Sequence, residues 1–454
     1  MNLLHHFQRI TEGWSDAFTQ PRTAIRACSL AGALLCGVGR RTITRALGFL
    51  DKEHVDWSAD YRVFSRSPWQ GEDLFNPMMT EAIARHADTG PLVMAWDDTI
   101  VPRTGRQVPG TAWRWDPMSP PFHVNFIRGQ RYLLGALVLP LYLQNATSSP
   151  RTLPVRFVEC PGVRKPGRKA GSIELAQYRE QKKKHTLSVC FVEQARRMRQ
   201  TLDEAGLAGR DLLCALDGSY NNKTVWKAQR ERTRIIARTR KDAKLCFPST
   251  ERGRAYARET WTPLSVYEDP SRPWTTVRAF FGGQWRDIRF KEVGPVLWRS
   301  AGRNKKLRLI VLAPTPYRVS QNGRKYYRQE SFLLTDDLTS AVGVLIQAYL
   351  DRYQIEFNHR DEKSVLGVGQ AQVWSDKSTP RVPEFIVAAY SALLLAGLAA
   401  YGPTRTKEYR ELPKWRRKAK RPSCQDLVTL LRQQYSRMND PLSSPKQMIL
   451  TAAA

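Results

Sequence analysis

Two short apolar runs in the chain each stop at an acidic residue. The first run, 92–96, is followed by Asp97 and Asp98, and the second run, 212–216, is followed by Asp217. A short apolar run bounded by turn or charged residues is typical of a buried strand. The pattern predicts two strands that carry carboxylates to the edge of a sheet. For each aspartate taken alone, a turn or cap role is the alternative.

A longer periodic stretch, 339–363, predicts a helix with one strongly polar face. It lacks proline, and its apolar residues recur at helical spacing. At about 100° per residue, Tyr349, Arg352, Glu356 and Lys363 lie within roughly 60° of one another. Such a face presents a carboxylate flanked by a phenol and two cations, which suits a metal ion beside a phosphate backbone. The alternative is an ion-pair stripe on a solvated helix, because Arg352 and Glu356 are four residues apart.

The first 88 residues have the periodicity of an all-helical segment. An apolar helix is predicted over 22–36 and a turn over 37–39, and a second helix begins with Arg40, Arg41 and Arg45 near its start. This arrangement fits a helix-turn-helix whose second helix approaches DNA. An ordinary helical hairpin with a solvated basic face is the alternative.

Further along, apolar and polar residues alternate in short runs over 261–312, which predicts strands. The apolar stretch from Phe385 is about 16 residues long and contains Tyr390 and Ser391, so it is short for a membrane span. We expect it to form a buried helix of the catalytic core. The first thirty residues carry His, Asp, Glu and Arg and do not resemble a secretory signal.

Composition narrows the class of partner. The chain has 454 residues, and 72 Lys and Arg against 42 Asp and Glu give a formal net charge of +30. An excess of this size favours a polyanionic partner, either DNA or RNA. The seven cysteines include no C-x2-C pair, which argues against a zinc site or a disulfide framework and suits a reducing cytosol.

The helix pattern resembles a known signature. Tyr349, Arg352, Glu356 and Lys363 reproduce the Y-x2-R-x3-E-x6-K spacing of a large branch of DDE-superfamily bacterial insertion-sequence transposases. The upstream WDDT and LDGSY segments resemble the first two acidic motifs of that superfamily, with a DDT-type first motif. The resemblance covers roughly residues 40–398.

The resemblance implies an α/β fold with a ribonuclease-H-like core, a mixed five-strand sheet with flanking helices. The expected segments are a helical DNA-binding domain (1–88), the first part of the core (89–240), a β-rich insertion (241–330), the second part of the core with the glutamate helix (331–401) and a basic C-terminal arm (402–454). In relatives the insertion contacts the transposon end and can hold a flipped base. Trp285 and Trp298 are candidates for that stacking, with core packing the favoured alternative for each.

The same resemblance implies the catalytic chemistry. Asp97, Asp217 and Glu356 would be the catalytic carboxylates and would coordinate two Mg²⁺ ions, or Mn²⁺ in substitution. Asp98 is the alternative to Asp97, because some relatives read as D-T, and only one of the two can face the metal ions, since neighbouring residues on a strand point to opposite faces. Arg352 and Lys363 would hold the phosphates that flank the scissile bond, with Tyr349 against the DNA backbone.

The implied function is cut-and-paste DNA transposition by strand cleavage at the element ends and strand transfer. The implied partners are double-stranded DNA, namely transposon ends with inverted repeats and target DNA, and a second copy of the chain in a homodimer on DNA. No membrane partner is expected, and the expected location is the cytoplasm, at the bacterial nucleoid. A transposase-derived DNA-binding regulator without cleavage and a dedicated ribonuclease-H-fold nuclease are the alternatives.

Overall fold

The computed structural model describes residues 1–439 except 88, 106, 117–118, 121, 123–124, 164, 319–322 and 416–418. Two compact units make up the chain. One unit, here called the helical unit, combines Met1–Met78 with Arg360–Ala454, and the other, the sheet unit, is Met79–His359. Of the basic arm predicted at 402–454, residues 416–418 and 440–454 lie outside the described residues.

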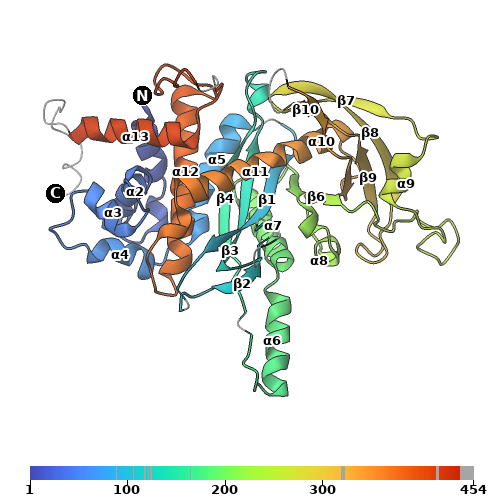
Figure 1. The fold of residues 1–454 in the computed structure, drawn as a ribbon, viewed down its shortest axis with the longest axis horizontal. Helices are drawn as coiled ribbons and strands as arrows, with labels where there is room; N and C mark the ends of the chain where they lie inside the picture. The colour runs from blue at the N-terminus through green and yellow to red at the C-terminus, as the bar shows by residue number, and fades with distance from the viewer. Residues whose placement is uncertain are drawn as a thin grey trace. The chain divides into compact units, whose positions relative to one another are not determined.

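A ten-stranded mixed sheet forms the sheet unit (Figure 1), in the order β2-β3-β1-β5-β6-β12-β9-β8-β7, with β4 paired to β3. The strands are β1 (Leu92–Pro102), β2 (Ala112–Trp115), β3 (Phe126–Leu139), β4 (Arg151–Glu159), β5 (Leu212–Leu216), β6 (Thr233–Thr239), β7 (Thr275–Phe281), β8 (Gln284–Val296), β9 (Leu307–Leu312) and β12 (Ser331–Thr335). A small hairpin of β10 (Pro316–Arg318) and β11 (Lys325–Tyr327) stands apart from this sheet.

The middle of the sheet combines both strand directions. β1, β5 and β6 pair in parallel, whereas β3 pairs antiparallel with β1 and β4. The order β4-β3-β1-β5-β6 in a mixed α/β unit is compatible with a ribonuclease-H-like core. Strands from the segment 241–330 continue the same sheet, because β12 pairs antiparallel with both β6 and β9.

The helices of the sheet unit are α6 (Ser172–Lys184), α7 (Leu187–Glu204), α8 (Lys223–Lys227), α9 (Pro263–Glu268), α10 (Val342–Asp351) and α11 (Ile355–Arg360), the last of which ends at the first residue of the helical unit. A hydrophobic cluster joins α10 to the sheet. It includes Leu345 and Ile346 of α10 with Leu213, Ala215 and Ile236 of β5 and β6. Burial of apolar side chains is the main stabilising contribution where a helix packs on a sheet. It fixes α10, and the helical turns that follow it, against one face of the sheet.

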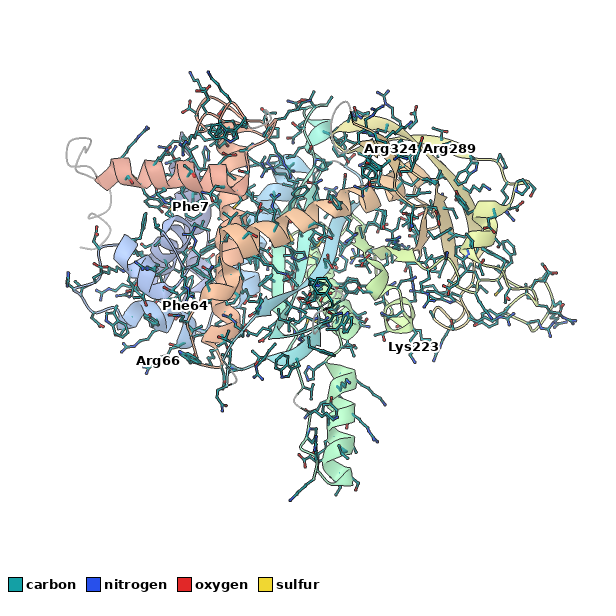
Figure 2. All side chains as sticks on the ribbon, viewed as in Figure 1. Phe7, Phe64, Arg66, Lys223, Arg289 and Arg324 are labelled. Carbon is teal, nitrogen blue, oxygen red and sulfur yellow. The ribbon has the colours of Figure 1, made fainter. Side chains whose placement is uncertain are left out.

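The helical unit contains α1 (Leu3–Glu12), α2 (Pro21–Cys36), α3 (Ile43–Phe49), α4 (Ser58–Ser65), α12 (Ser378–Tyr401) and α13 (Cys424–Asn439), while α5 (Gly71–His86) runs across the boundary between the units. Phe385 of α12 meets the rings of Trp14, Phe64 and Trp69. Phe7 and Phe64 are buried among these helices (Figure 2). Aromatic edge-to-face packing of this kind stabilises a helical core beyond simple burial.

The long apolar helix near the C-terminus confirms one prediction and corrects another. α12 is apolar and long enough to cross a membrane by composition, but 89% of its most apolar window is buried inside the protein. The prediction of a buried helix is therefore confirmed. Its main packing partners are α1, α2, α4 and α13 rather than the sheet, so its place is the helical unit. The sequence of a helix that is apolar on all sides predicts that the helix is buried, but it does not predict which elements pack against it.

The glutamate helix also differs from the single helix predicted over 339–363. The helical path consists of α10, a 3-10 turn (Arg352–Gln354), α11 and a π turn (Asp361–Val365). It begins at Val342, because the Asp337 carboxylate accepts hydrogen bonds from the backbone of Thr339 and Ser340 and holds those residues in a turn. Such mid-helix changes of hydrogen-bonding pattern are uncommon and often accompany functional positions.

We predict that Gly135→Ala lowers the free energy of unfolding by about 1–3 kcal/mol, because overpacking a core forces neighbouring groups to shift. An added Cβ at Gly135 would lie 2.6 Å from the ring of Trp96, which is fully buried. Urea unfolding followed by tryptophan fluorescence measures the loss. Gly209→Ala is the matched control, since a Cβ there meets nothing within 4 Å. Equal effects of the two substitutions would contradict the prediction.

Candidate active site

The two acidic strand ends predicted from the sequence lie side by side. β1 and β5 pair in parallel up to Trp96 and Leu216, so Asp97 and Asp217 are the next residues on neighbouring strands. Adjacent strands are about 4.8 Å apart. β5 stops at Leu216, whereas β1 continues through both aspartates to Pro102, because the long strand β3 still pairs with it. The two backbones therefore separate at this point and leave the edge beside Asp97 open.

Strand alternation places the side chains of Asp97 and Asp217 on one face of the sheet. Leu213 and Ala215 belong to the cluster that packs against α10, and successive side chains alternate between faces. Asp217 continues this series in an extended conformation. Val93, in register with Leu213, also packs against the cluster. Asp97 is four residues beyond Val93 and shares its face, so both carboxylates face the side that α10 covers.

Asp98 points to the opposite face and has an ionic partner there. Its Oδ2 lies 2.9 Å from Arg131 Nε. Burial raises the pKa of the Asp98 carboxyl, and the attraction of Arg131 only partly offsets this effect. The geometry therefore gives Asp98 a structural ion pair with β3 and separates it from Asp217.

Asp97 is surrounded by cationic or hydrogen-bonding groups from the glutamate helix. His359 Nε2 lies 3.7 Å from Asp97 Oδ2. Burial raises the pKa of the Asp97 carboxyl, but the hydrogen bond and charge of His359 and the charge of Arg352 outweigh it, so the net pKa is lowered. Asp97 is therefore held in its ionised form, as a metal ligand must be.

Glu356 lies between these two neighbours of Asp97 along the helical path. Arg352, Glu356 and His359 are four and three residues apart, the spacing of side chains on one helix face. Glu356 is solvent-exposed in the first turn of α11. Within the described residues, no three Asp, Glu, His or Cys side chains are close enough together to hold a metal ion as a preformed group. The site thus has carboxylates on one face of the sheet and on the helix above it, without a closed cluster.

The remaining residues of the helix signature have distinct surroundings. Tyr349 packs against the α10 cluster, and burial raises the pKa of its hydroxyl, with Asp217 contributing in the same direction. The guanidinium carbon of Arg352 lies 5.8 Å from the centre of the Tyr349 ring. Lys363 is exposed in the π turn, which belongs to the helical unit.

Three buried aromatic rings support the acidic strands from the other face. Trp96 meets Phe191 of α7 at a centroid distance of 5.6 Å, and Phe191 meets Tyr220 at 5.5 Å. Trp96 directly precedes Asp97, and Tyr220 ends the 3-10 turn that follows Asp217. Because fully buried rings interlock in this way, the backbone at both carboxylates is fixed by core packing.

A cavity of about 660 Å³ opens beside Asp217. Its lining includes Asn221, Arg238, Arg240 and Lys241 together with Trp298. The cavity is polar and carries charges of both signs, because Asp242 and Glu330 also line it and Arg240 forms an ion pair with Asp242. Trp285, the other predicted stacking candidate, instead packs against Tyr142 and Phe280.

The comparisons with known proteins agree with this geometry. A family model described as DDE superfamily endonuclease matches residues 15–305, more than half of the chain. The chain belongs to this family. The family acts on DNA and implies a metal-dependent nuclease activity. The match includes Asp97 and Asp217 and ends before Glu356. A search of curated proteins finds no match.

The N-terminal arginines predicted to contact DNA have different environments. α3 begins at Ile43 and is capped by the Thr42 side chain, so Arg40 and Arg41 precede the helix. Arg40 and Arg45 are exposed, as the predicted contact with DNA requires. Arg41 is only 8% exposed, and its guanidinium donates to the carbonyl of Val365. This environment gives Arg41 a packing contact in the helical unit, and its contact with DNA stays a prediction.

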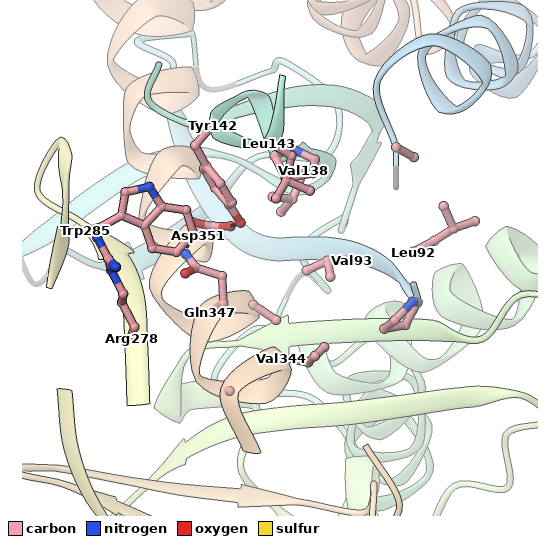
Figure 3. A pocket seen from close by; sticks show the side chains of 15 residues that line it. Leu92, Val93, Val138, Tyr142, Leu143, Arg278, Trp285, Val344, Gln347 and Asp351 are labelled. Carbon is pink, nitrogen blue, oxygen red and sulfur yellow. Dashed lines mark hydrogen bonds between the residues drawn. The ribbon is translucent and has the colours of Figure 1, made fainter. Parts of the chain in front are cut away.

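Sequence reasoning missed two polar residues of the glutamate helix. One is His359, for which a histidine three residues after the signature glutamate is a weak signal. The other is Asp351, whose carboxylate accepts hydrogen bonds of 2.8 Å from Tyr142 Oη and Gln347 Nε2. Figure 3 shows these three side chains together in a cavity of about 240 Å³, with Trp285 beside them. Gln347 also bonds the backbone N–H and carbonyl of Phe280, so this network ties α10 to β7.

Burial raises the pKa of Asp351 from 3.8 to about 7, against the opposing effect of its two hydrogen bonds. The folded chain then holds a proton that the unfolded chain releases between these two values, so this group's contribution to stability is lost as pH rises from about 4 to 7. We predict that the stability of Asp351→Asn relative to the native chain rises over that range, by up to about 1.4 kcal/mol per pH unit.

Urea unfolding of both proteins at several pH values between 4.5 and 7.5 measures this difference. Asp211→Asn is the matched control, because Asp211 is exposed. A constant difference between the native chain and Asp351→Asn would show that Asp351 does not titrate in this range.

Proposed function

We propose that the chain is a DNA transposase that cleaves DNA at the ends of a mobile element and joins the freed ends to target DNA. The observation that carries this proposal is the placement of Asp97 and Asp217 on one face of two adjacent parallel strands, under the helix that bears Glu356. Membership of the DDE superfamily endonucleases and the Tyr-Arg-Glu-Lys spacing support it.

Asp97, Asp217 and Glu356 are the residues that would hold divalent metal ions. Carboxylate oxygens are the ligands that Mg²⁺ and Mn²⁺ prefer, and the lowered pKa of Asp97 keeps that donor ionised. When bound, two such ions supply an activated oxygen nucleophile and stabilise the leaving oxygen of an in-line phosphoryl displacement. Glu356 is exposed in the first turn of α11, so its side chain would complete the set of carboxylate donors by turning toward the two aspartates.

The cations around the carboxylates have a second role with substrate. Arg352 stands over the Tyr349 ring and beside Asp97, and an arginine in such a position can hold a phosphate in a bidentate manner. Lys363 is exposed and available for a phosphate contact. His359 orients Asp97 and lowers its pKa, so it acts through the carboxylate as a positioning residue.

The cavity beside Asp217 suits one strand of the substrate. Arg238 and Lys241 can neutralise phosphates, and Trp298 offers a surface on which a base can stack. Phosphate neutralisation by a protein of net charge +30 also predicts affinity that falls steeply with salt. The further parts of the proposal are a homodimer that bridges two element ends and recognition of inverted repeats.

We predict that Glu356→Gln lowers Mg²⁺-dependent DNA cleavage by at least about 100-fold, the scale of losing one strong transition-state interaction. DNA affinity should change by less than about 3-fold, because Glu356 is exposed and is expected to bind metal rather than to support the fold. Gel-shift and cleavage assays on the same preparation measure both quantities. Undiminished cleavage would remove Glu356 from the catalytic set.

A strand-joining assay, run beside the cleavage and binding assays, separates a transposase from a nuclease and from a regulator. A pre-cut element end with a free 3′ hydroxyl is incubated with target plasmid and Mg²⁺. Joined products support the transposase proposal. Cleavage without joining favours a dedicated nuclease, and binding without either reaction favours a regulator.

We predict that Asp97→Asn also lowers cleavage by at least about 100-fold, whereas Asp98→Asn lowers it by less than about 10-fold. The reason is that Asp97 faces Asp217 and the glutamate helix, while Asp98 pairs with Arg131 on the other face. Asp98→Asn should instead lower stability, since it leaves the half-buried Arg131 without its anion. The reverse pattern in cleavage and thermal unfolding would transfer the metal-binding role to Asp98.

A further inference from the structure

Helix α6 extends from the sheet unit with no face packed against it. Figure 1 shows it projecting away from the sheet, and its side chains point outward on both sides in Figure 2. None of its residues is buried. An isolated helix of 13 residues is only marginally stable in water. Local contacts support it, namely the ion pair between Glu180 and Lys184 at 2.8 Å and Lys182 over the Tyr178 ring.

The apolar residues of α6 do not form a stripe. At about 100° per residue, Ile173, Leu175, Ala176 and Tyr178 point near 0°, 200°, 300° and 140°. A helix that docks on a protein groove or on a membrane needs its apolar residues on one face. Their scatter argues against both kinds of partner.

The charge of α6 and the loop before it favours a polyanionic binding partner. Residues 161–186 contain eight lysines and arginines and two glutamates, a formal net charge of +6. Three of the cations, Lys182, Lys183 and Lys184, are consecutive in the last turn of α6 and are exposed. Exposed lysines on a solvated helix can each neutralise a phosphate.

Both ends of the segment are anchored beside the acidic strands. The residue that ends β4, Glu159, pairs with Tyr132 of β3, which pairs with Thr99 of β1. The chain therefore leaves the sheet level with Asp97 and Asp98 and two strands away, about 10 Å. The returning chain is fixed by Asn222 Nδ2, which donates to Ser188 Oγ at 2.8 Å and lies shortly after Asp217.

The two ends of the segment also touch each other. Cys160 Sγ, directly after β4, lies 2.9 Å from Cys190 Sγ in α7. The loop and helix between them, residues 161–186, therefore form an arm with a closed base. A helix of 13 residues is about 20 Å long, roughly half a turn of duplex DNA.

We propose that this arm binds the phosphate backbone of the DNA duplex that flanks the scissile bond. The inference rests on the proposed function, because the flanking duplex is defined by cleavage at the neighbouring carboxylates. The arm adds affinity that is independent of base sequence, without contacting the reacting phosphate.

The test uses the full chain with Lys182, Lys183 and Lys184 all replaced by Gln. The control replaces the same three by Arg, which keeps the charge. Affinity for a long duplex with flanking DNA is measured by fluorescence anisotropy at several salt concentrations. The Gln variant should bind at least about 10-fold more weakly, and its salt dependence should fall by about two to three phosphate contacts. The Arg variant should bind like the native chain.

The location of the contact is tested with a duplex that ends at the cleavage site. Native and Gln proteins should bind this short duplex equally, and at saturating protein both should cleave the long one at rates within about 2-fold, since the arm lies outside the reacting groups. Circular dichroism checks that α6 remains helical in both variants.

Three results would overturn the inference. Unchanged affinity and salt dependence in the Gln variant would make the arm a solvated surface. An equal loss on short and long duplexes would make its charge a general attraction without a flanking contact. A change of oligomeric state in the Gln variant, with DNA binding intact, would make the partner another protein chain. If the native chain neither binds nor cleaves DNA, the proposed function fails with it, whereas native activity with unaltered variants refutes the arm alone.

Discussion

The parallel register between β1 and β5 is the constraint on which the rest of the site depends. Pairing of Trp96 with Leu216 sets Asp97 level with Asp217. Because side chains alternate along a strand, a slip of one residue would turn Asp97 away from Asp217 and bring Asp98 into its place. The register is secured by burial on both faces, with Trp96 against Phe191 on one side and Ala215 in the α10 cluster on the other. Core packing far from solvent thus decides which of two adjacent carboxylates faces Asp217.

The second element of the site, the glutamate helix, is positioned by polar contacts as much as by apolar ones. Gln347 pairs with the backbone of Phe280 as another strand would, and Asp351 accepts from Tyr142 and from Gln347. Asp351 precedes Arg352 by one residue and Glu356 by five. Buried polar networks of this kind are costly unless fully satisfied, so they fix one arrangement of the helix rather than adding much net stability. The 3-10 and π turns then interrupt regular helix on either side of α11, where Glu356 lies.

Sequence alone predicted the elements that depend on local patterns. The two apolar runs became β5 and the first half of β1, and the stretch from Phe385 became a buried helix. The choice between Asp97 and Asp98 was left open, because the pattern gives alternation but not which face each residue takes. The burial of Arg41 and the packing partners of α12 were missed for a related reason, since both depend on segments distant in the sequence. His359 and Asp351 act through contacts with β1 and with Tyr142, which local spacing does not encode.

The charges around Asp97 and Asp217 depend on one another. Two carboxylates at the level of one strand pair would repel each other and take up protons if they stood alone in a half-buried site. Arg352 and His359 counter this effect at Asp97, so the anion is available without a metal ion already bound. The exposed lysines of α6 add positive charge further from the acidic pair. A site built in this way combines anionic ligands at its centre with a cationic surround, which is what a polyanionic substrate and divalent ions together require.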